Sequence, residues 1–432
     1  MNLGSDQTGM PETNYLQQVA ELGEMQTVVC TEHIQSVDGA RLLPKGAKLN
    51  RQVIKHLLNH KLLKPIDLTT RIEDAVDQQT LITLGRSLME RDSEMGTLLR
   101  MMRGEKFVRQ SCARVHLEPP IQNKLTVAQK LHPELLEHSL RVMLAVTVIG
   151  EQLGLSEQEL EVLATAGLLH DLGELHLGIV DLPLEQNLNL EHWQQVRSHP
   201  IVGAMILQQF PAYANHVART VQEHHERTDG SGYPYGLNGT AMSRTGRLLS
   251  FAELAIGALK KYSLRQLSNI IKSNLDALDP QPVGVFLNAL RQFQTQITVA
   301  PSEARDENIV SLFKLVAQLV SSAETISESF KSTPGSIQTC LLGPVVGNIH
   351  QTLRRAGFDL HNTEATLAMI NNDQETFIEL EELLMESVYQ LRKALLEMER
   401  HNGGRDGDNQ AIIRQWVADA EQHLDTAANL LS

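Results

Sequence analysis

The chain has 432 residues, of which 42% are apolar and 21% are charged, and its formal net charge is −14. This composition is typical of a folded protein with two or three domains. The negative charge argues against nonspecific binding to DNA or to an anionic membrane.

The cysteines and the N-terminal residues favour a cytoplasmic protein. Cys30, Cys112 and Cys340 are far apart and offer neither a disulfide framework nor a zinc-knuckle spacing. The first residues lack the basic and apolar regions of a signal peptide, and no stretch approaches 18 consecutive apolar residues. We therefore predict a cytoplasmic location and no membrane span.

Residues 1–25 are polar and are predicted to form a flexible leader. Residues 26–118 are predicted to form a small α+β module followed by a helical connector. In the module, Val37–Gly39 predicts a tight turn, and an amphipathic helix is expected over residues 51–63. Such a module can serve packing or dimerisation, and a ligand sensor is the alternative.

Two consecutive prolines, Pro119 and Pro120, predict a domain boundary. The domain expected over residues 119–295 is a series of helices, at about 133–153, 156–172, 190–209, 211–226 and 243–262. Ser156 and Glu159 are spaced as a capping box for the second of these. Pro200 is expected to kink or restart the third, and the glycine-rich residues 230–239 predict a structured loop.

The remaining residues, 296–432, are predicted to form a C-terminal helical bundle for dimerisation or partner docking. Amphipathic helices are expected at 307–331, 337–357, 362–401 and 409–431. No histidine–carboxylate cluster with ligand spacing is evident in these helices, so a second catalytic site is the less favoured alternative. The predicted fold class is mainly α, with an all-helical metal-binding domain at its centre.

A possible metal site begins at the adjacent residues His170 and Asp171, which follow an apolar helical run. An imidazole nitrogen and a carboxylate oxygen from consecutive residues can reach one ion or two neighbouring ions. A surface or helix-capping role is the alternative for such a pair considered alone. Upstream, Glu134 and His138 stand four residues apart, on one face of a helix.

The motifs His170-Asp-Leu-Gly, His199-Pro and His224-His-Glu-Arg-Thr-Asp-Gly-Ser-Gly-Tyr-Pro follow one another in the chain. In this order they resemble the HD-GYP family of bacterial signalling phosphodiesterases, over roughly residues 125–293. The long and compositionally unusual third motif carries most of this resemblance.

The resemblance implies a site with two or three divalent metal ions, iron or manganese, and Asp171 as the ligand that bridges two of them. Eight candidate ligands follow from it: Glu134, His138, His170, Asp171, His199, His224, His225 and Glu253. Metal ions at such a site would activate water and neutralise charge on phosphoryl oxygens. His176, His192 and His216 are interpreted as surface residues.

The chain departs from the family pattern at three positions. Glu174 stands where relatives usually have a lysine, which would attract the phosphate that glutamate repels. Glu253 replaces the usual aspartate ligand and has a longer side chain. At Tyr262 many relatives carry a substrate-binding arginine, for which Arg265 could compensate in part.

His170, Asp171 and Glu174 are the candidate catalytic residues. Arg227, Asp229 and Tyr233 are candidates for substrate contact together with Arg265, because the Gly-Tyr-Pro loop shapes the pocket in the family. An ion pair between Arg227 and Asp229 that stiffens the loop is the alternative.

The resemblance implies hydrolysis of cyclic di-GMP to pGpG and towards GMP. A second hypothesis is a binding or scaffold protein that holds metal with little or no turnover. A third is hydrolysis of another cyclic dinucleotide or phosphoester. A signalling protein is a possible partner through the Gly-Tyr-Pro loop or the C-terminal helices, and a homodimer is expected.

Overall fold

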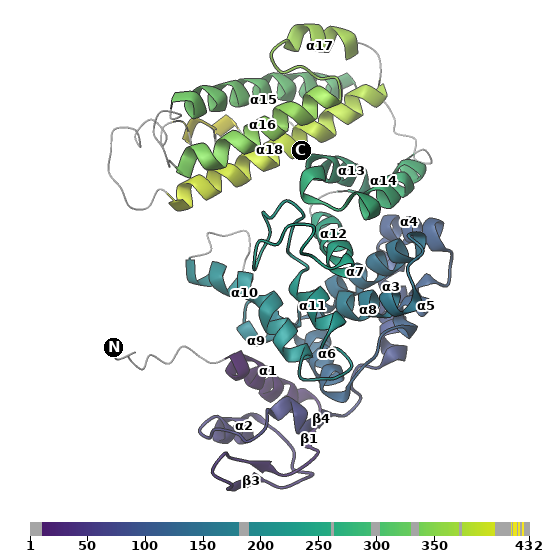
Figure 1. Cartoon of the computed structure of the whole chain (residues 1–432), viewed down its shortest axis with the longest axis vertical. Coiled ribbons are helices and arrows are strands. Elements are labelled where there is room, and N and C mark those ends of the chain that lie inside the picture. The colour runs from purple at the N-terminus through teal and green to yellow at the C-terminus, as the bar shows by residue number, and fades with distance from the viewer. Residues whose placement is uncertain are drawn as a thin grey trace. The chain divides into compact units, whose positions relative to one another are not determined.

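The computed structural model describes residues 11–180, 190–260, 263–294, 303–329, 337–370 and 374–401, with a few positions between 416 and 426. The chain divides into two compact units. Unit 1 contains residues 1–261 and 275–292, and unit 2 contains residues 262–274 and 293–432. Helices dominate both units (Figure 1), which confirms the prediction of a mainly α fold.

The N-terminal leader is a helix, α1 (Pro11–Met25), so the prediction of a flexible leader is wrong for residues 11–25. Its apolar residues Tyr15, Val19 and Leu22 are buried. They lie three to four positions apart and form one apolar face, which packs against α6 and α9 described below. Burial of this face stabilises a helix in a segment whose composition is mostly polar.

The small module after α1 contains four short strands and one helix. β1 (Val28–Cys30) pairs with β4 (Thr70–Ile72), and β2 (Ile34–Gln35) pairs with β3 (Arg41–Leu43), both antiparallel. The predicted turn before β3 is confirmed, because Gly39 has a positive φ of 86° and its N–H donates to the Ser36 carbonyl.

Helix α2 (Arg51–Leu57) is six residues shorter than predicted. Asn50 caps its N-terminus by accepting a hydrogen bond from the Val53 N–H. Beyond the helix, the Leu63 N–H donates to the Gln35 carbonyl, and the Lys61 carbonyl accepts from the Val37 N–H. The helix ends early because the backbone of residues 61–63 forms hydrogen bonds with residues 35–37 instead.

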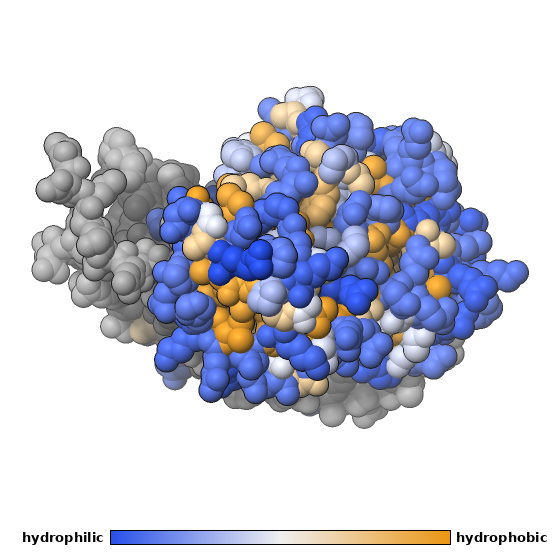
Figure 2. Space-filling model, turned by 90° about the horizontal axis from the view of Figure 1, so that it is seen from below, coloured by the Kyte–Doolittle hydropathy of each residue, from blue (hydrophilic) through white to orange (hydrophobic). Residues whose placement is uncertain are grey.

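Viewed from the end where α2 and the short strands lie in Figure 1, hydrophilic residues cover most of the surface, and hydrophobic residues form smaller groups between them (Figure 2). Val37 and Leu63 are among the large apolar residues exposed in this module, at 53% and 55%. Such residues are common on protein surfaces and imply no partner by themselves.

The predicted boundary at the two prolines does not separate compact units. Pro119 and Pro120 occupy the first turn of α6 (Pro119–Leu131), where the missing N–H of proline costs nothing. From α6, Asn123 accepts a hydrogen bond from the Ile72 N–H, and the Thr126 hydroxyl accepts one from the Val76 N–H. The N-terminal module therefore belongs to the same unit as the helices that follow.

The region predicted as a helical connector consists of α3 (Gln78–Arg91), α4 (Ser93–Arg103) and α5 (Phe107–Ala113). All three pack against α7 (Pro133–Gln152). They are part of the core of unit 1, because Leu88, Leu99 and Phe107 are buried there.

Lys124 on α6 is the centre of a buried polar cluster. Its ammonium lies 2.6 Å from Asp67 Oδ2, 2.9 Å from His176 Nε2 and 4.0 Å from the centre of the Tyr15 ring. The His176 ring stacks on Tyr15 at 4.8 Å. His176 is therefore buried, and its interpretation as a surface residue is wrong. Burial and the nearby Lys124 charge hold the pKa of His176 well below its usual value.

Replacement of Lys124 by methionine is expected to lower the free energy of unfolding by about 3–5 kcal/mol, because it leaves the Asp67 carboxylate without its buried cation. Urea or thermal denaturation measures this change. Lys130→Met, at an exposed position of the same helix, is the matched control and should shift stability by less than about 0.5 kcal/mol. Equal effects of the two substitutions would contradict the importance of the buried pair.

The central helices of unit 1 lie close to the five positions predicted between residues 133 and 262, and a further helix at residues 280–294 was not predicted. The structure places them at α7, α8 (Glu157–Leu169), α9 (Leu172–Leu177), α10 (Leu190–Leu207), α11 (His216–Gln222), α12 (Arg244–Ala258) and α14 (Pro280–Gln294), with short 3₁₀ turns at Ile66–Leu68 and Leu275–Ala277. The capping box of Ser156 and Glu159 is confirmed. The helix predicted over 156–172 ends earlier, at Leu169, and His170 and Asp171 lie between it and α9, which begins at Leu172.

Unit 2 is helical, with α13 (Leu264–Ser273), α15 (Glu303–Ser329), α16 (Ile337–Arg355), α17 (Thr363–Ile370) and α18 (Gln374–His401). The helix predicted over 362–401 is thus divided into α17 and α18. Most of the helix predicted over 409–431 lies outside the described residues.

One helical segment in the described part of the chain, Glu307–Ile326, has the length and composition of a membrane span. Its residues Phe313, Val316 and Val320 belong to a buried cluster with residues of α16 and α18. A helix at the core of a helical bundle has the same composition, and this packing accounts for its apolar character.

Candidate metal centre

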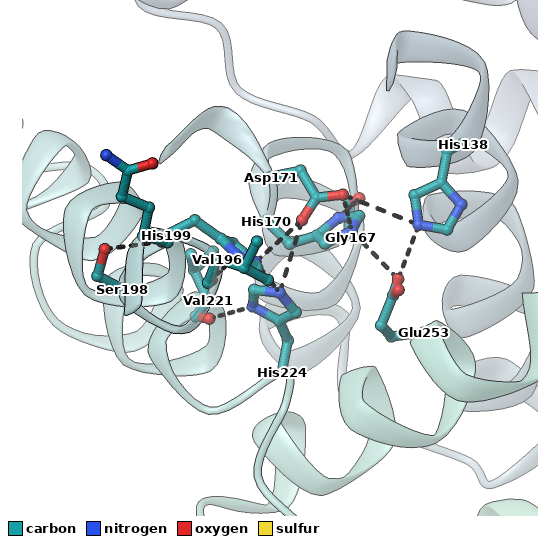
Figure 3. Close-up of polar contacts among 11 residues, drawn as sticks. His138, Gly167, His170, Asp171, Val196, Ser198, His199, Val221, His224 and Glu253 are labelled. Atoms are coloured by element: carbon teal, nitrogen blue, oxygen red, sulfur yellow. Dashed lines mark hydrogen bonds and ion pairs between the residues drawn. The ribbon is translucent and has the colours of Figure 1, made fainter. Parts of the chain in front are cut away.

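Five elements of unit 1 bring candidate ligands together around Asp171 (Figure 3). His170 and Asp171 occupy the break between α8 and α9, where helical geometry ends and adjacent side chains can converge. The other ligands come from α7, α10, the end of α11 and α12, and are His138, His199, His224 and Glu253.

Backbone carbonyls orient three of the imidazole rings. Nδ1 of His170 lies 3.0 Å from the Gly167 carbonyl, and Nδ1 of His199 and of His224 lie 2.6 Å and 2.5 Å from the carbonyls three residues before them. Because a carbonyl oxygen can only accept, each Nδ1 carries the proton. In the neutral ring, Nε2 then presents its lone pair to the centre, as in a metal-binding histidine.

Pro200 explains how His199 is oriented within a continuous helix. A proline has no N–H, so it cannot donate to the carbonyl four residues earlier, which is that of Val196. The His199 Nδ1–H donates to this carbonyl instead. The predicted interruption of the helix does not occur, because α10 continues to Leu207, but the proline does help to direct the histidine into the site.

The first ligand group surrounds Asp171 Oδ1. His199 Nε2 lies 3.4 Å and His224 Nε2 3.6 Å from this oxygen, and the two nitrogens are 3.0 Å apart. Donor atoms about 2.1 Å from a shared ion lie roughly 3.0–3.4 Å apart in octahedral or tetrahedral geometry. A ligand atom of His225 lies within 4.8 Å of the others and completes this group.

The second ligand group surrounds Asp171 Oδ2, which lies 2.9 Å from His170 Nε2 and 3.8 Å from His138 Nε2. Glu253 Oε2 lies 2.9 Å from His138 Nε2 and 3.2 Å from His170 Nε2. The Glu253 carboxylate therefore contacts both histidines of this group.

The electrostatics of the cluster suit metal binding. Burial opposes ionisation of Asp171, but the facing imidazoles of His170, His199 and His224 hold the pKa of Asp171 well below its usual value. His138 and His170 do the same for Glu253. Burial and the neighbouring histidines lower the pKa of His224 to about 4, so its ring is neutral at neutral pH.

The two groups share Asp171 and can each hold a divalent metal ion. His170 Nε2 is buried without a hydrogen-bond partner among the described residues, and a metal ion would satisfy it. The Nε2 atoms of His199 and His224 lie 3.0 Å apart, a spacing at which both can bind one metal ion. The donor set therefore fits two ions that Asp171 bridges.

Two predicted residues are not brought into these groups. Glu134 is exposed in the first turn of α7 and belongs to neither group, so its role as a ligand stays a prediction. Arg265 lies on α13 in unit 2, and its side chain, like all of Tyr262, lies outside the described residues.

Glu174 lies one turn into α9, close enough to Asp171 for their charges to interact. Burial, followed by the charges of Asp171 and Glu253, raises the pKa of Glu174 to about 7. An ionised Glu174 adds a third carboxylate to a site that already has two. Its negative charge would repel an anionic substrate, as we predicted from the sequence.

Two buried glutamates that sequence analysis did not single out hold the loop after α11. Glu226 accepts hydrogen bonds from the backbone N–H groups of Tyr235 and Leu237, at 2.7 and 2.8 Å. Glu223 accepts from the backbone and hydroxyl of Ser243. Their positions in the sequence, on either side of the histidine pair, were the signal that could have identified them. A carboxylate that is buried beside such a pair needs several hydrogen-bond donors.

Arg227 anchors the same loop to α12, because its guanidinium donates to the Ser250 hydroxyl at 2.6 Å and to the Glu226 carbonyl. Asp229 is exposed and accepts from the Ser231 backbone and hydroxyl. No ion pair joins Arg227 to Asp229 among the contacts of the described residues, so the predicted alternative for them is wrong. Their contact with substrate stays a prediction.

Tyr233 lies beside the metal ligands, as the loop motif predicts. Its ring stacks on His225 at 4.6 Å, and its backbone N–H donates to the His225 carbonyl. Arg197 is exposed, and its guanidinium lies over the Tyr233 ring, 5.6 Å from the ring centre. This residue was not among the predicted site residues.

Two glycines of the motifs are required by close backbone contacts. A Cβ at Gly173 would lie 2.2 Å from the His199 carbonyl oxygen, so α9 and α10 could not approach as they do. A Cβ at Gly232 would lie 2.4–2.5 Å from backbone atoms of residues 225–227. The glycines thus allow the site loops to pack against the ligand-bearing helices.

Of the remaining histidines, His216 is exposed as predicted, and His192 is half-buried. His176 is the buried residue described above. None of the three belongs to the two metal-binding groups.

The chain is similar to known proteins over the segment that contains this site. A family model described as an HD domain matches residues 127–270. The chain is 30% identical over 171 residues to the 3'3'-cGAMP-specific phosphodiesterase 3 of Vibrio cholerae, covering 38% of this chain and 37% of that protein. It is 27% identical over 280 residues to the 3'3'-cGAMP-specific phosphodiesterase 1 of the same organism, covering 56% and 64%.

A third relative is the cyclic di-GMP phosphodiesterase response regulator RpfG of Xanthomonas campestris, with 33% identity over 108 residues, 25% of this chain and 29% of that protein. The chain spans less than two thirds of the length of each of these three relatives. The matched segment contains His138, His170, His199, His224 and Glu253. The resemblance to the HD-GYP family is confirmed over this segment, which matches the HD-domain model.

Proposed function

We propose that this protein is a phosphodiesterase that hydrolyses a cyclic dinucleotide at a centre with two divalent metal ions. The observation that carries this proposal is the pair of ligand groups that share Asp171. The relatives named as phosphodiesterases of cyclic di-GMP and of 3'3'-cGAMP support the class of substrate.

The protein's own residues prepare the site for a phosphodiester. His138, His170, His199, His224, Asp171 and Glu253 would hold the metal ions. Bound ions supply Lewis-acid stabilisation of the phosphoryl oxygens and lower the pKa of water. Asp171 links the two ligand groups, because each of its oxygens faces a different group.

Local positive charge must offset the net charge of −14 for an anionic substrate to bind. Arg197 is exposed and lies over the Tyr233 ring, which contacts the rings of His199 and His225. It can supply the cation that Glu174 does not, and the Tyr233 ring offers an aromatic surface to a base.

We propose cyclic di-GMP as the substrate, with pGpG and then GMP as products, and 3'3'-cGAMP as the competing substrate. Imidazole and carboxylate donors suit iron or manganese as the metal. The alternative of a metal-holding scaffold with little turnover rests on Glu174, whose carboxylate lies in the site. We place the reaction in the cytoplasm. A homodimer and a signalling partner at the Gly-Tyr-Pro loop or C-terminal helices remain predictions.

The experiment is hydrolysis of each cyclic dinucleotide by the full chain, loaded anaerobically with iron(II) or with manganese(II), with products separated by chromatography. Formation of linear dinucleotide or mononucleotide that is absent with Asp171→Ala supports the proposal. No product from a folded, metal-loaded protein would favour the scaffold. A higher kcat/KM for 3'3'-cGAMP than for cyclic di-GMP would correct the substrate.

Substitution of Glu174 by lysine is expected to raise kcat/KM for the cyclic dinucleotide by about tenfold, equivalent to about 1.4 kcal/mol of added transition-state stabilisation. The reason is that it replaces a carboxylate near Asp171 with a cation. Steady-state kinetics measure the change, and Glu174→Gln, which only removes the charge, should give a smaller gain. A loss of activity in both variants would show that the Glu174 carboxylate has a role of its own.

A further inference from the structure

Glu324, His350 and His361 form a second group of metal-ligand type in unit 2, in the region where sequence analysis found no such cluster. We propose that these three side chains bind a Zn²⁺ ion, independently of the centre in the HD domain. The spacing of these residues in the sequence does not reveal the group, because the packing of the helices brings the three residues together.

The donor atoms have the spacing of ligands to one ion. His350 Nδ1 lies 3.5 Å from Glu324 Oε1, and one ligand atom from each of the three side chains lies within 4.8 Å of the others. Two donors about 2.0–2.1 Å from a tetrahedral zinc ion lie about 3.4 Å apart. A small inward movement of His361 is therefore sufficient to complete a site with three protein ligands.

The first two ligands project from helices that the core of unit 2 holds in place. Glu324 follows the fully buried Ala323 on α15, and His350 follows the buried Ile349 on α16. These two helices pack side by side, and both contribute to the same hydrophobic cluster. The Glu324 and His350 side chains are only partly exposed, at 35% and 22%.

The third ligand comes from a short connection that is fixed by its own contacts. His361 lies between Leu360, which is buried, and Asn362, which caps α17 by accepting from the Ala365 N–H. The His361 N–H donates to Asp359 Oδ1, and the buried Thr366 hydroxyl holds the Asp359 backbone. The connection is thus preorganised, which lowers the entropic cost of binding an ion.

The donor set selects the metal. Two imidazoles and one carboxylate suit zinc, whereas calcium and magnesium prefer oxygen ligands alone. The His361 ring meets the His350 ring edge to face at 4.5 Å, so both rings lie beside the carboxylate. An ion pair between His350 and Glu324 alone would not account for the His361 ring beside them. Since His361 is exposed, an ion can reach the site from solvent.

Zinc bound per chain tests this site. Full-length protein and variants are dialysed to equilibrium against micromolar free zinc and analysed by mass spectrometry of the metal. His350→Ala, His361→Ala and Glu324→Gln are each expected to bind one zinc ion fewer per chain than the unaltered protein. The exposed pair of His56 on α2 and His60 just after it, replaced together by alanine, is the matched control and should lose none.

Tryptophan fluorescence gives a second, local measurement. The chain has two tryptophans, and the Trp416 indole donates to the Ser322 hydroxyl, two residues before Glu324. In a Trp193→Phe background, Co²⁺ should quench Trp416 fluorescence, zinc should reverse this, and His361→Ala should abolish the effect. Unchanged zinc content in His361→Ala and Glu324→Gln, with the same Co²⁺ quenching, would overturn the proposal. Neither measurement depends on the activity of the HD domain.

Discussion

Asp171→Asn is expected to remove metal from both ligand groups and to lower kcat/KM by about a thousandfold or more, equivalent to about 4 kcal/mol. Oδ1 of this residue faces His199 and His224, and Oδ2 faces His170 at 2.9 Å. Asparagine preserves the shape of the side chain, but its amide NH2 cannot bind a metal ion and its remaining oxygen carries no charge, so neither group keeps a carboxylate ligand from this residue. One substitution therefore disrupts both groups.

Metal content per chain and the rate of cyclic dinucleotide hydrolysis measure this effect. Asp38→Asn, in an exposed turn of the N-terminal module, is a control that removes the same charge far from the ligands in the sequence. It should leave both quantities unchanged. Full metal content in a folded Asp171→Asn variant would contradict the bridging role, whatever the activity.

Glu253→Asp is expected to weaken binding at the second ligand group while sparing the first. The Glu253 carboxylate lies 2.9 Å from His138 Nε2 and 3.2 Å from His170 Nε2, and shortening the side chain by one methylene withdraws it by about 1.5 Å. The helix α12 that carries it is packed against α7 and α8 and cannot follow. The expected result is loss of one of two metal ions and at least about a tenfold lower kcat.

The measurement is metal stoichiometry by titration, with the change assigned through a comparison with His138→Ala, which should lose the same ion. Glu159→Asp, which shortens a carboxylate in the capping box of α8, is the control for shortening of a glutamate elsewhere in the domain. If Glu253→Asp binds two ions with unchanged affinity, the glutamate at this position is tolerated and not required.

Much of the candidate site could be predicted from the sequence because its ligands lie in short motifs. His170 and Asp171 are adjacent, and His224 and His225 are part of a long unusual motif, so local residue order identifies them. The roles of Glu223 and Glu226 were not predicted, because their hydrogen bonds reach residues 9 to 20 positions away.

Helices with regular apolar periodicity were also predictable, as α8 and its capping box show. Helix α1 was not, because its apolar residues become informative only when α6 and α9 cover them. The two prolines at 119 and 120 illustrate the same limit. A proline pair breaks a helix or begins one, and only the packing of the flanking segments decides between these outcomes.

Local periodicity and residue order were enough to predict the mainly α class, the motifs that resemble an HD domain and most of the candidate metal ligands. Helix packing brings Lys124 and His176 together in a buried cluster, and it also brings Glu324, His350 and His361 together. Residues far apart in the chain meet through helix packing, which depends on the fit of many side chains at once and leaves no motif in the sequence.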